Sequence, residues 1–222
     1  TENHTLQVSD NLWFNDSISG ALLTKIYDRP LQNKKYRYSC LGFILLQKCI
    51  ENITGMPMDQ YLAESIYEPM GLNLMFNPSG KISKDKIIAS NDDKFFRKEV
   101  VQGFVHDETA ALLGGVSGNA GLFGTATDVA AVYQMLLNGG VYKDKRYLGE
   151  STCKLFTTTK SKISRRGLGF DKPSAVAGQS SPCSLSTPKE TFGHTGFTGT
   201  CAWADPVNHL VYLFVSNRTF PS

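Results

Sequence analysis

Hydrophobic residues recur at helical spacing through the first two thirds of the chain. Apolar positions three and four residues apart predict a buried helix over residues 40–52, with Ser39 as its cap and Gly55 as its end. Pro57 suits the first turn of a second amphipathic helix, and Pro69 and Gly71 are expected to stop it. Each of these helices is predicted to pack one apolar face against the rest of the chain.

The most regular amphipathic pattern begins after Thr125. Thr125 and Asp128 have the spacing of a capping box, apolar residues follow at helical intervals, and the Asn-Gly-Gly sequence at 138–140 closes the pattern. The preceding stretch, 114–124, holds five glycines, which predict turns or close backbone approach. A weaker helical pattern covers residues 18–26 within an otherwise polar N-terminal stretch.

Strand-like patterns are found toward the C-terminus. Residues 191–194, 201–204 and 210–216 are predicted to be strands, and a short polar turn joins the last two. Helices first and strands last, without alternation, predict an α+β fold. The predicted organisation is one domain over residues 1–222, irregular over 1–37, mainly helical over 38–157, a loop over 158–189 and antiparallel strands over 190–218.

Composition limits the class of protein. With 222 residues, 41% hydrophobic and 19% charged, the chain can form a globular core. The apolar runs are far shorter than the roughly 18 residues of a membrane span, so we expect no membrane span. The chain opens with Thr1 and no apolar leader, so we expect it to be a piece of a longer protein whose signal peptide, if any, lies elsewhere.

Charge and metal-ligating residues exclude further classes. A net charge of +3 is too small for a nucleic-acid surface, and the basic pairs Lys34-Lys35 and Arg165-Arg166 are interpreted as solvated loop charges. The five cysteines and four histidines show neither a Cys-x-x-Cys pair nor a metal-ligand spacing. We therefore expect no metal, no cofactor and no nucleic-acid partner.

Two short motifs carry the strongest functional signal, Tyr38-Ser39-Cys40 and His194-Thr195-Gly196. Between them lie Glu-Pro-Met-Gly-Leu at 68–72 and Gly-x-Ala-Gly-Leu-Phe-Gly-Thr-Ala at 118–126, in the same order as in a known family. Together they resemble the penicillin-recognising serine hydrolases, which include class C β-lactamases, D-alanyl-D-alanine carboxypeptidases and esterases. The resemblance implies a β-lactamase/transpeptidase-like fold, a helical subdomain followed by strands, truncated at the N-terminus and at the C-terminal helix.

The resemblance also implies roles for individual residues. Such enzymes form an acyl-enzyme through a serine, which needs a proton acceptor and oxyanion donors. Tyr38 corresponds to a proton-relaying tyrosine, and His194 to the cationic position of a Lys/His-Thr-Gly strand. Thr195, Gly196 and Phe197 would bind substrate, with the Phe197 N–H as one oxyanion donor. Cys40 would belong to the same substrate-binding surface.

This sequence departs from the family pattern at two positions. Cys40 stands where the family usually has Asn, and a thiol cannot supply the donors and acceptor of an amide. His194 stands where many members have Lys, so this position is predicted to be less cationic at neutral pH. A Cys40–His194 nucleophilic pair is the alternative, although a cysteine that opens an apolar helix is more often an inert packing residue.

The Ser-x-x-Lys motif of the nucleophile has no convincing match. Ser83, Ser151 and Ser186 each have a lysine three residues on, but about one or two such matches arise by chance in a chain of this composition. All three follow Tyr38, whereas the family order places the nucleophile before the tyrosine. We therefore expect the nucleophile to lie upstream and the chain alone to be inactive. The alternative is a non-catalytic peptidoglycan-binding or accessory module with the same fold.

A finer resemblance connects residues 165–173 and 105–107 with serine-hydrolase modules fused to glycoside hydrolase family 3 β-N-acetylhexosaminidases. It implies a glycoside hydrolase domain as an N-terminal partner in the same protein. The substrate would be a peptidoglycan peptide or a small molecule such as a β-lactam or ester. The location implied by the resemblance is periplasmic or secreted.

Overall fold

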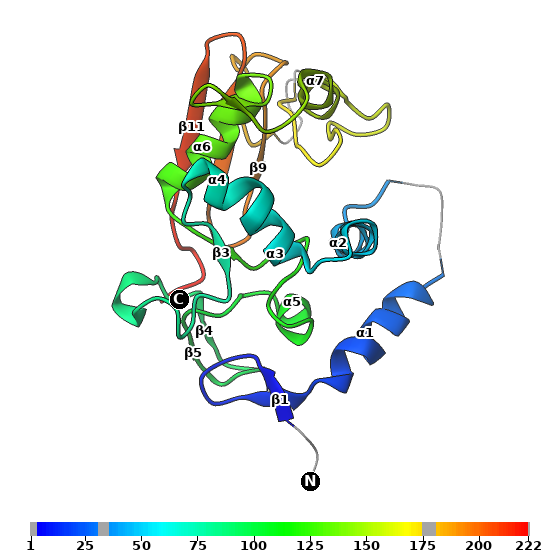
Figure 1. The fold of residues 1–222 in the computed structure, drawn as a ribbon, viewed down its shortest axis with the longest axis vertical. Helices are drawn as coiled ribbons and strands as arrows, with labels where there is room; N and C mark the ends of the chain where they lie inside the picture. The colour runs from blue at the N-terminus through cyan, green and yellow to red at the C-terminus, as the bar shows by residue number, and fades with distance from the viewer. Residues whose placement is uncertain (1–3, 31–35, 175–180, 222) are drawn as a thin grey trace. The chain divides into compact units, whose positions relative to one another are not determined.

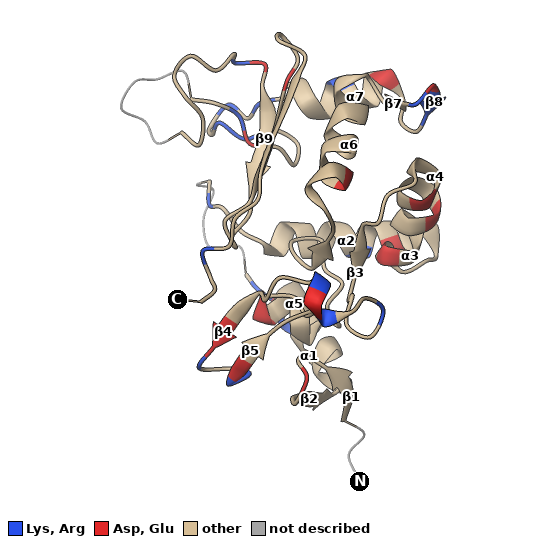
Figure 2. Cartoon of the chain, turned by 90° about the vertical axis from the view of Figure 1, so that its left-hand side faces the viewer, with Lys and Arg blue, Asp and Glu red and all other residues tan. Residues whose placement is uncertain are grey.

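The computed structural model describes residues 4–30, 36–174 and 181–221 (Figure 1). The chain forms two compact units, one of residues 1–124 together with 218–222 and one of residues 125–217. Both contain helices and short antiparallel strands, as an α+β fold requires. Figure 2 shows acidic and basic residues interspersed over the elements of both units. The predicted basic pair Lys34-Lys35 lies outside the described residues.

The first unit is built of short elements. They are β1 (His4–Gln7), β2 (Trp13–Asn15), α1 (Ser17–Tyr27), α2 (Leu41–Thr54), α3 (Met58–Leu62), a π-helical turn η1 (Ala63–Tyr67), α4 (Glu68–Met70), β3 (Met75–Phe76), a 3₁₀ turn η2 (Lys84–Lys86), β4 (Asn91–Asp93), β5 (Glu99–Val101), α5 (Glu108–Leu112) and β6 (Leu122–Phe123).

Helix α2 confirms the first predicted helix. The Ser39 hydroxyl accepts a hydrogen bond from the Leu41 N–H at 3.2 Å, while Gly55 ends the helix in the left-handed conformation with φ +69°. The prediction that this helix is buried was wrong. Within α2 only Ile44 and Gln47 are buried, and Ile53 is 84% exposed. Its apolar residues spread over more than the one face that the rest of the first unit covers.

The second predicted helix is divided. Pro69 does not end it but lies inside α4, and the chain before it widens into the π-helical turn η1. Because Pro69 has no N–H to donate, a wider turn accommodates it without breaking the helical path. Gly71, with φ +72°, ends the helix, so the Gly71 part of the prediction is confirmed.

The N-terminal stretch is more ordered than the sequence predicts. Helix α1 confirms the weak pattern at residues 18–26, but an antiparallel hairpin of β1 and β2 precedes it. Leu6 and Phe14 of this hairpin pack against a buried cluster around Val8 and Val105. Because the partners come from distant residues, the local pattern did not reveal the strands.

A buried arginine fixes the loops around this cluster. The Arg97 side chain has 0% exposure. Its guanidinium donates to the carbonyl oxygens of Val8, Val105 and His106 at 3.0, 2.8 and 3.1 Å. Burial alone would raise the pKa of Asp93, but backbone N–H donors and Arg97 outweigh it and hold that pKa below its usual value. Arg97 thus joins three segments that share no sheet.

The glycine-rich stretch lies directly on α2. Gln47, 3% exposed, donates to the Val116 carbonyl at 3.2 Å and accepts from the Gly118 N–H at 3.1 Å. A Cβ at Gly118 would lie 2.1 Å from the Phe43 carbonyl oxygen. The predicted close backbone approach is confirmed, and it anchors the helix that Tyr38 precedes.

The second unit holds a three-stranded sheet. Its elements are α6 (Ala126–Leu137), β7 (Val141–Tyr142), β8 (Lys145–Arg146), α7 (Glu150–Thr158), β9 (Phe192–Thr195), β10 (Cys201–Asp205) and β11 (Leu210–Phe214). The strands lie in the order β11-β10-β9, all antiparallel, which confirms the predicted strands within two residues at each end.

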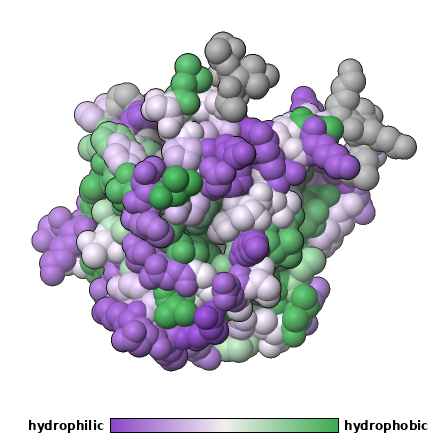
Figure 3. All heavy atoms as spheres, turned by 90° about the horizontal axis from the view of Figure 1, so that it is seen from above, coloured by the Kyte–Doolittle hydropathy of each residue, from purple (hydrophilic) through white to green (hydrophobic). Residues whose placement is uncertain are grey.

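Helix α6 packs on this sheet. The capping box of Thr125 and Asp128 is present, so the strongest sequence signal is confirmed. The Tyr133 ring stacks on Phe192 of β9 with centroids 6.3 Å apart, and the Phe170 ring meets Phe192 edge-on at 5.1 Å. By contrast, alternate residues of the edge strand β11, namely Leu210, Tyr212 and Phe214, are exposed. Figure 3 shows hydrophobic residues scattered among hydrophilic ones on the surface seen from above.

Substituting Gly118 tests the packing on α2. Gly118→Ala places a methyl group against the Phe43 carbonyl, so we expect about 1–3 kcal/mol lower stability in urea unfolding. Gly42→Ala, in α2 itself, is the matched control, since its Cβ would meet nothing within 4 Å and alanine favours the helix. Equal effects of the two substitutions would contradict the proposed packing.

Candidate active site

The end of β9 brings together four of the predicted site residues. His194 and Thr195 are its last two residues, and Gly196 and Phe197 follow in a tight turn back to β10. The Gly196 N–H donates to the Thr200 carbonyl at 2.6 Å, and a Cβ at Gly196 would lie 2.2 Å from the Thr200 hydroxyl. A larger residue at position 196 would therefore have to displace the Thr200 side chain.

Strand β9 is also glycine-dependent on its other side. A Cβ at Gly193 would lie 2.6 Å from the Trp203 ring, which belongs to the paired residue of β10. The Gly193 N–H donates to the Asp171 carbonyl at 3.1 Å, and the Asp171 N–H donates back to the Gly193 carbonyl at 2.7 Å. The loop before β9 thus extends the sheet by one residue pair next to His194.

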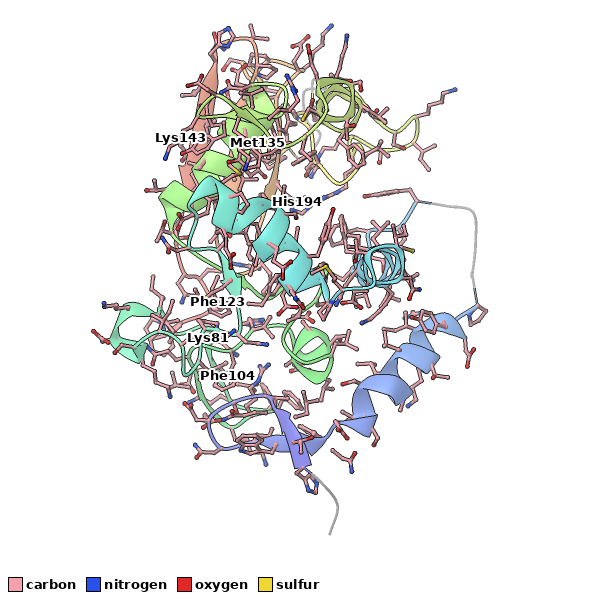
Figure 4. All side chains as sticks on the ribbon, in the orientation of Figure 1. Lys81, Phe104, Phe123, Met135, Lys143 and His194 are labelled. Atoms are coloured by element: carbon pink, nitrogen blue, oxygen red, sulfur yellow. The ribbon has the colours of Figure 1, made fainter. Side chains whose placement is uncertain are left out.

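His194 has a hydrogen-bond partner at each ring nitrogen. Its Nδ1 lies 2.7 Å from the Thr195 carbonyl oxygen, and its Nε2 lies 2.5 Å from Nη1 of Arg166. Figure 4 labels His194 on the strand. The imidazole is therefore held by its own strand on one side and by the loop on the other.

The carboxylate of Asp171 is the centre of this loop. It is 1% exposed and accepts from Arg165 at 2.7 and 2.9 Å, and Arg166 lies 3.4 Å away. The Lys172 N–H donates to it at 2.9 Å. Burial would raise the pKa of Asp171, but the Arg165 hydrogen bonds and the other donors outweigh it and lower that pKa. Arg165 and Arg166 are therefore not the solvated loop charges that the sequence suggested.

Lys172 connects the same loop to the end of α7 and to the residues before β9. Its buried ammonium donates to the carbonyl oxygens of Thr157, at the end of α7, and Glu190, the latter at 3.1 Å. It also lies 5.8 Å from the centre of the Phe192 ring. Burial lowers the pKa of Lys172. Residues 171 and 172 thus fix a stretch that the sequence predicts as loop.

The tyrosine motif lies before α2 in the first unit. Tyr38 is 53% exposed, and Cys40 is the partly buried residue that precedes the helix, with helical backbone angles. Tyr38 and Cys40 thus stand together at the start of α2, as His194 to Phe197 stand together at the end of β9.

The serines of the chance matches lie elsewhere. Ser83 precedes the single turn η2 and donates to Asp85, Ser151 lies on the exposed side of α7, and Ser186 pairs with the Ser184 hydroxyl at 3.0 Å in an exposed loop. Among the described residues, no group of three or more His, Cys, Asp and Glu side chains could hold a metal ion. No helix in the described part of the chain is long and apolar enough to cross a membrane.

Comparison with known proteins decides the family. The sequence matches the beta-lactamase family over residues 3–222. The chain belongs to this family. A protein of Escherichia coli strain K12 named "Putative D-alanyl-D-alanine carboxypeptidase" is 35% identical over 250 residues, which cover 97% of this chain and 57% of that protein. A protein of the same name from Salmonella agona strain SL483 is 32% identical, over 95% of this chain and 54% of its own length.

Solved structures agree on the fold. A penicillin-binding protein homologue from Caulobacter crescentus matches with a TM-score of 0.62 and 19% identity, over 97% of this chain and 63% of that one. A beta-lactamase from Mycobacterium bovis matches with a TM-score of 0.55 and 20% identity, over 84% and 58%. The chain therefore has a beta-lactamase-like fold and spans between half and two thirds of the length of these proteins.

No sequence motif predicted the contacts that Arg165 and Arg166 make with Asp171 and His194. In the sequence of this beta-lactamase family member, Arg165 and Arg166 were apparent as a basic pair, six and five residues before an acidic residue, and as the start of the segment 165–173 of the finer resemblance. That spacing is a weak signal, because it does not show that Asp171 would be buried against β9. The contact between Arg166 and His194 joins residues 28 positions apart, so only the fold reveals it.

The acid stability of the second unit tests the role of Asp171. Asp171→Asn leaves two arginines without a carboxylate, so we expect about 3 kcal/mol lower stability at pH 7. Because folding lowers the pKa of Asp171, its contribution is present above the unfolded value and is lost as the pH falls below about 4. The difference from wild type in urea unfolding should therefore shrink between pH 7 and pH 3.

Asp144→Asn is the matched control for this experiment. Asp144 lies exposed in the turn between β7 and β8, and asparagine suits its positive φ of 62°. The control should match wild type at both pH values. A penalty for Asp171→Asn that is as large at pH 3 as at pH 7 would contradict the ionic role.

Proposed function

We propose that this chain is part of a serine hydrolase that cleaves D-alanine-terminated cell-wall peptides through an acyl-enzyme. The observation that carries the proposal is the end of β9, where His194, Thr195, Gly196 and Phe197 form a fixed strand and turn, in a family member whose relatives are named carboxypeptidases. β-Lactams and small esters share the acyl chemistry and are substrates of the same proposal.

Each residue has a proposed role. Tyr38, at the start of α2, relays the proton of the nucleophile. His194 and Thr195 position the substrate beside the strand, and the Phe197 N–H stabilises the oxyanion. Gly196 permits the turn that presents this N–H. The nucleophilic serine is proposed to lie outside these 222 residues, so the chain alone is inactive.

Location and partners follow from the same proposal. An enzyme acting on cell-wall peptides works outside the cytoplasm, so we propose a periplasmic or secreted protein. A fused glycoside hydrolase domain stays a prediction. Determining the sequence of the whole parent protein would decide it, together with the presence of an upstream Ser-x-x-Lys motif.

Covalent labelling of the parent protein tests the catalytic role of Tyr38. Fluorescent penicillin should label it, and it should release D-alanine from an acyl-D-alanyl-D-alanine peptide. Tyr38→Phe removes the proton relay, so we expect the labelling rate to fall about 10²–10⁴-fold. Tyr36→Phe, two residues away and also exposed, is the matched control and should label like wild type.

Two results would contradict this catalytic proposal. Labelling that Tyr38→Phe does not slow removes Tyr38 from the mechanism. Binding of muropeptides without labelling or turnover would favour the non-catalytic accessory module, for which the replacement of asparagine by Cys40 is the one favourable observation.

Cys40 is expected to be a packing and binding residue rather than a nucleophile. Cys40→Ala in the parent protein should therefore keep covalent labelling, with a change in rate of about 10-fold or less. Cys49→Ala, in an exposed position of the same helix, is the control. Complete loss of labelling in Cys40→Ala alone, with the adduct mapped to that thiol in wild type, would establish the cysteine nucleophile instead.

A further inference from the structure

The partners of His194 determine where its proton lies. A carbonyl oxygen can only accept a hydrogen bond, and a guanidinium can only donate. Nδ1 faces the Thr195 carbonyl and Nε2 faces Arg166, so both contacts are hydrogen bonds only if Nδ1 carries the proton and Nε2 presents its lone pair. An imidazolium would instead direct an N–H of Nε2 against the N–H of Arg166.

The position of Arg166 is itself fixed by the fold. Asp171 is paired through its backbone with Gly193, the neighbour of His194, and its carboxylate holds the other end of the Arg166 guanidinium at 3.4 Å. Arg165 occupies the same carboxylate in bidentate geometry, whereas Nη1 of Arg166 lies 2.5 Å from Nε2 of His194. The two arginines therefore share one carboxylate but differ in their relation to the imidazole.

The charges of this group do not cancel. One buried carboxylate faces two guanidinium groups, so a positive charge remains beside a neutral His194. The Arg166 side chain is 24% exposed, which leaves it in contact with solvent near the end of β9. The positive charge near this strand position is therefore that of Arg166 in the loop, and not that of a residue on the strand.

We propose that Arg166 is a positioning residue for His194. It holds the imidazole neutral with the proton on Nδ1, and it supplies the positive charge that a lysine on the strand would otherwise provide. The tautomer follows from the geometry of the second unit alone. Its consequence for acyl transfer rests on the proposed function.

Nuclear magnetic resonance of the ¹⁵N-labelled 222-residue chain tests the assignment. Long-range ¹H–¹⁵N correlations distinguish the two tautomers and the imidazolium, and His194→Gln identifies the signals of this ring. At neutral pH we expect wild type to show a protonated Nδ1 and an unprotonated Nε2. In Arg166→Ala the Nε2–H tautomer or the imidazolium should become detectable, because the donor to Nε2 is gone.

Two further variants distinguish loss of the Arg166–His194 contact from a general disruption of the loop. Arg166→Lys keeps a side chain that only donates, and it should retain the wild-type tautomer. Arg165→Ala removes the neighbouring arginine and should also retain it. Slow hydrogen exchange at the paired Asp171 and Gly193 amides shows in each variant that the loop still lies on β9.

Several results would overturn the assignment. They are a wild-type ring with the proton on Nε2 or on both nitrogens, an unchanged spectrum in Arg166→Ala, loss of the tautomer in Arg166→Lys, and an equal change in Arg165→Ala. In the parent protein, Arg166→Ala should slow labelling by fluorescent penicillin about 10-fold, and Arg166→Lys should restore it. An unreactive parent protein would contradict the proposed function while leaving the tautomer result intact.

Discussion

The buried carboxylate of Asp171 is the interaction on which the second unit depends. A carboxylate that is 1% exposed is unfavourable unless its oxygens are fully engaged, and here two arginines and a backbone N–H engage them. The same residue pairs through its backbone with Gly193 of β9. One residue therefore joins a long loop to the edge of the sheet and delivers Arg166 to His194.

The first unit uses the opposite arrangement for the same purpose. There a fully buried guanidinium, Arg97, donates to three carbonyl oxygens and faces Asp93. Both units consist largely of short elements and connecting segments, whose backbone groups cannot all be satisfied within a sheet or helix. In each unit, one buried charged side chain makes several hydrogen bonds to groups outside the helices and sheets. These hydrogen bonds hold the loops in place together with apolar packing. These contacts give each unit defined turns although it has few long elements.

The sequence predicted the elements whose signals are local. Helices α2 and α6 were apparent from periodicity and capping residues, and the three strands of the sheet from their apolar runs. The hairpin of β1 and β2 was not, because Leu6 and Phe14 gain their burial from distant residues such as Val105. The order of the motifs led to the family, but the partner of His194 depends on Asp171 being buried, which no spacing in the chain reveals. Adjacent arginines in a polar stretch are more often exposed to solvent than paired with a buried carboxylate, so the sequence favoured the wrong interpretation of Arg165 and Arg166.

The contact between Arg166 and His194 also changes the electrostatic interpretation of the strand motif. Histidine in place of lysine predicts a weaker positive charge at neutral pH, provided that the ring itself must carry the charge. A neutral imidazole hydrogen-bonded to a guanidinium does not need to carry it, because arginine stays protonated throughout the physiological range. Charge and hydrogen-bond acceptor are then provided by two residues instead of one. As long as the loop stays paired with β9, the charge of Arg166 remains beside His194. The packing around Asp171, and not protonation of the ring, then determines the positive electrostatic potential at the end of the strand.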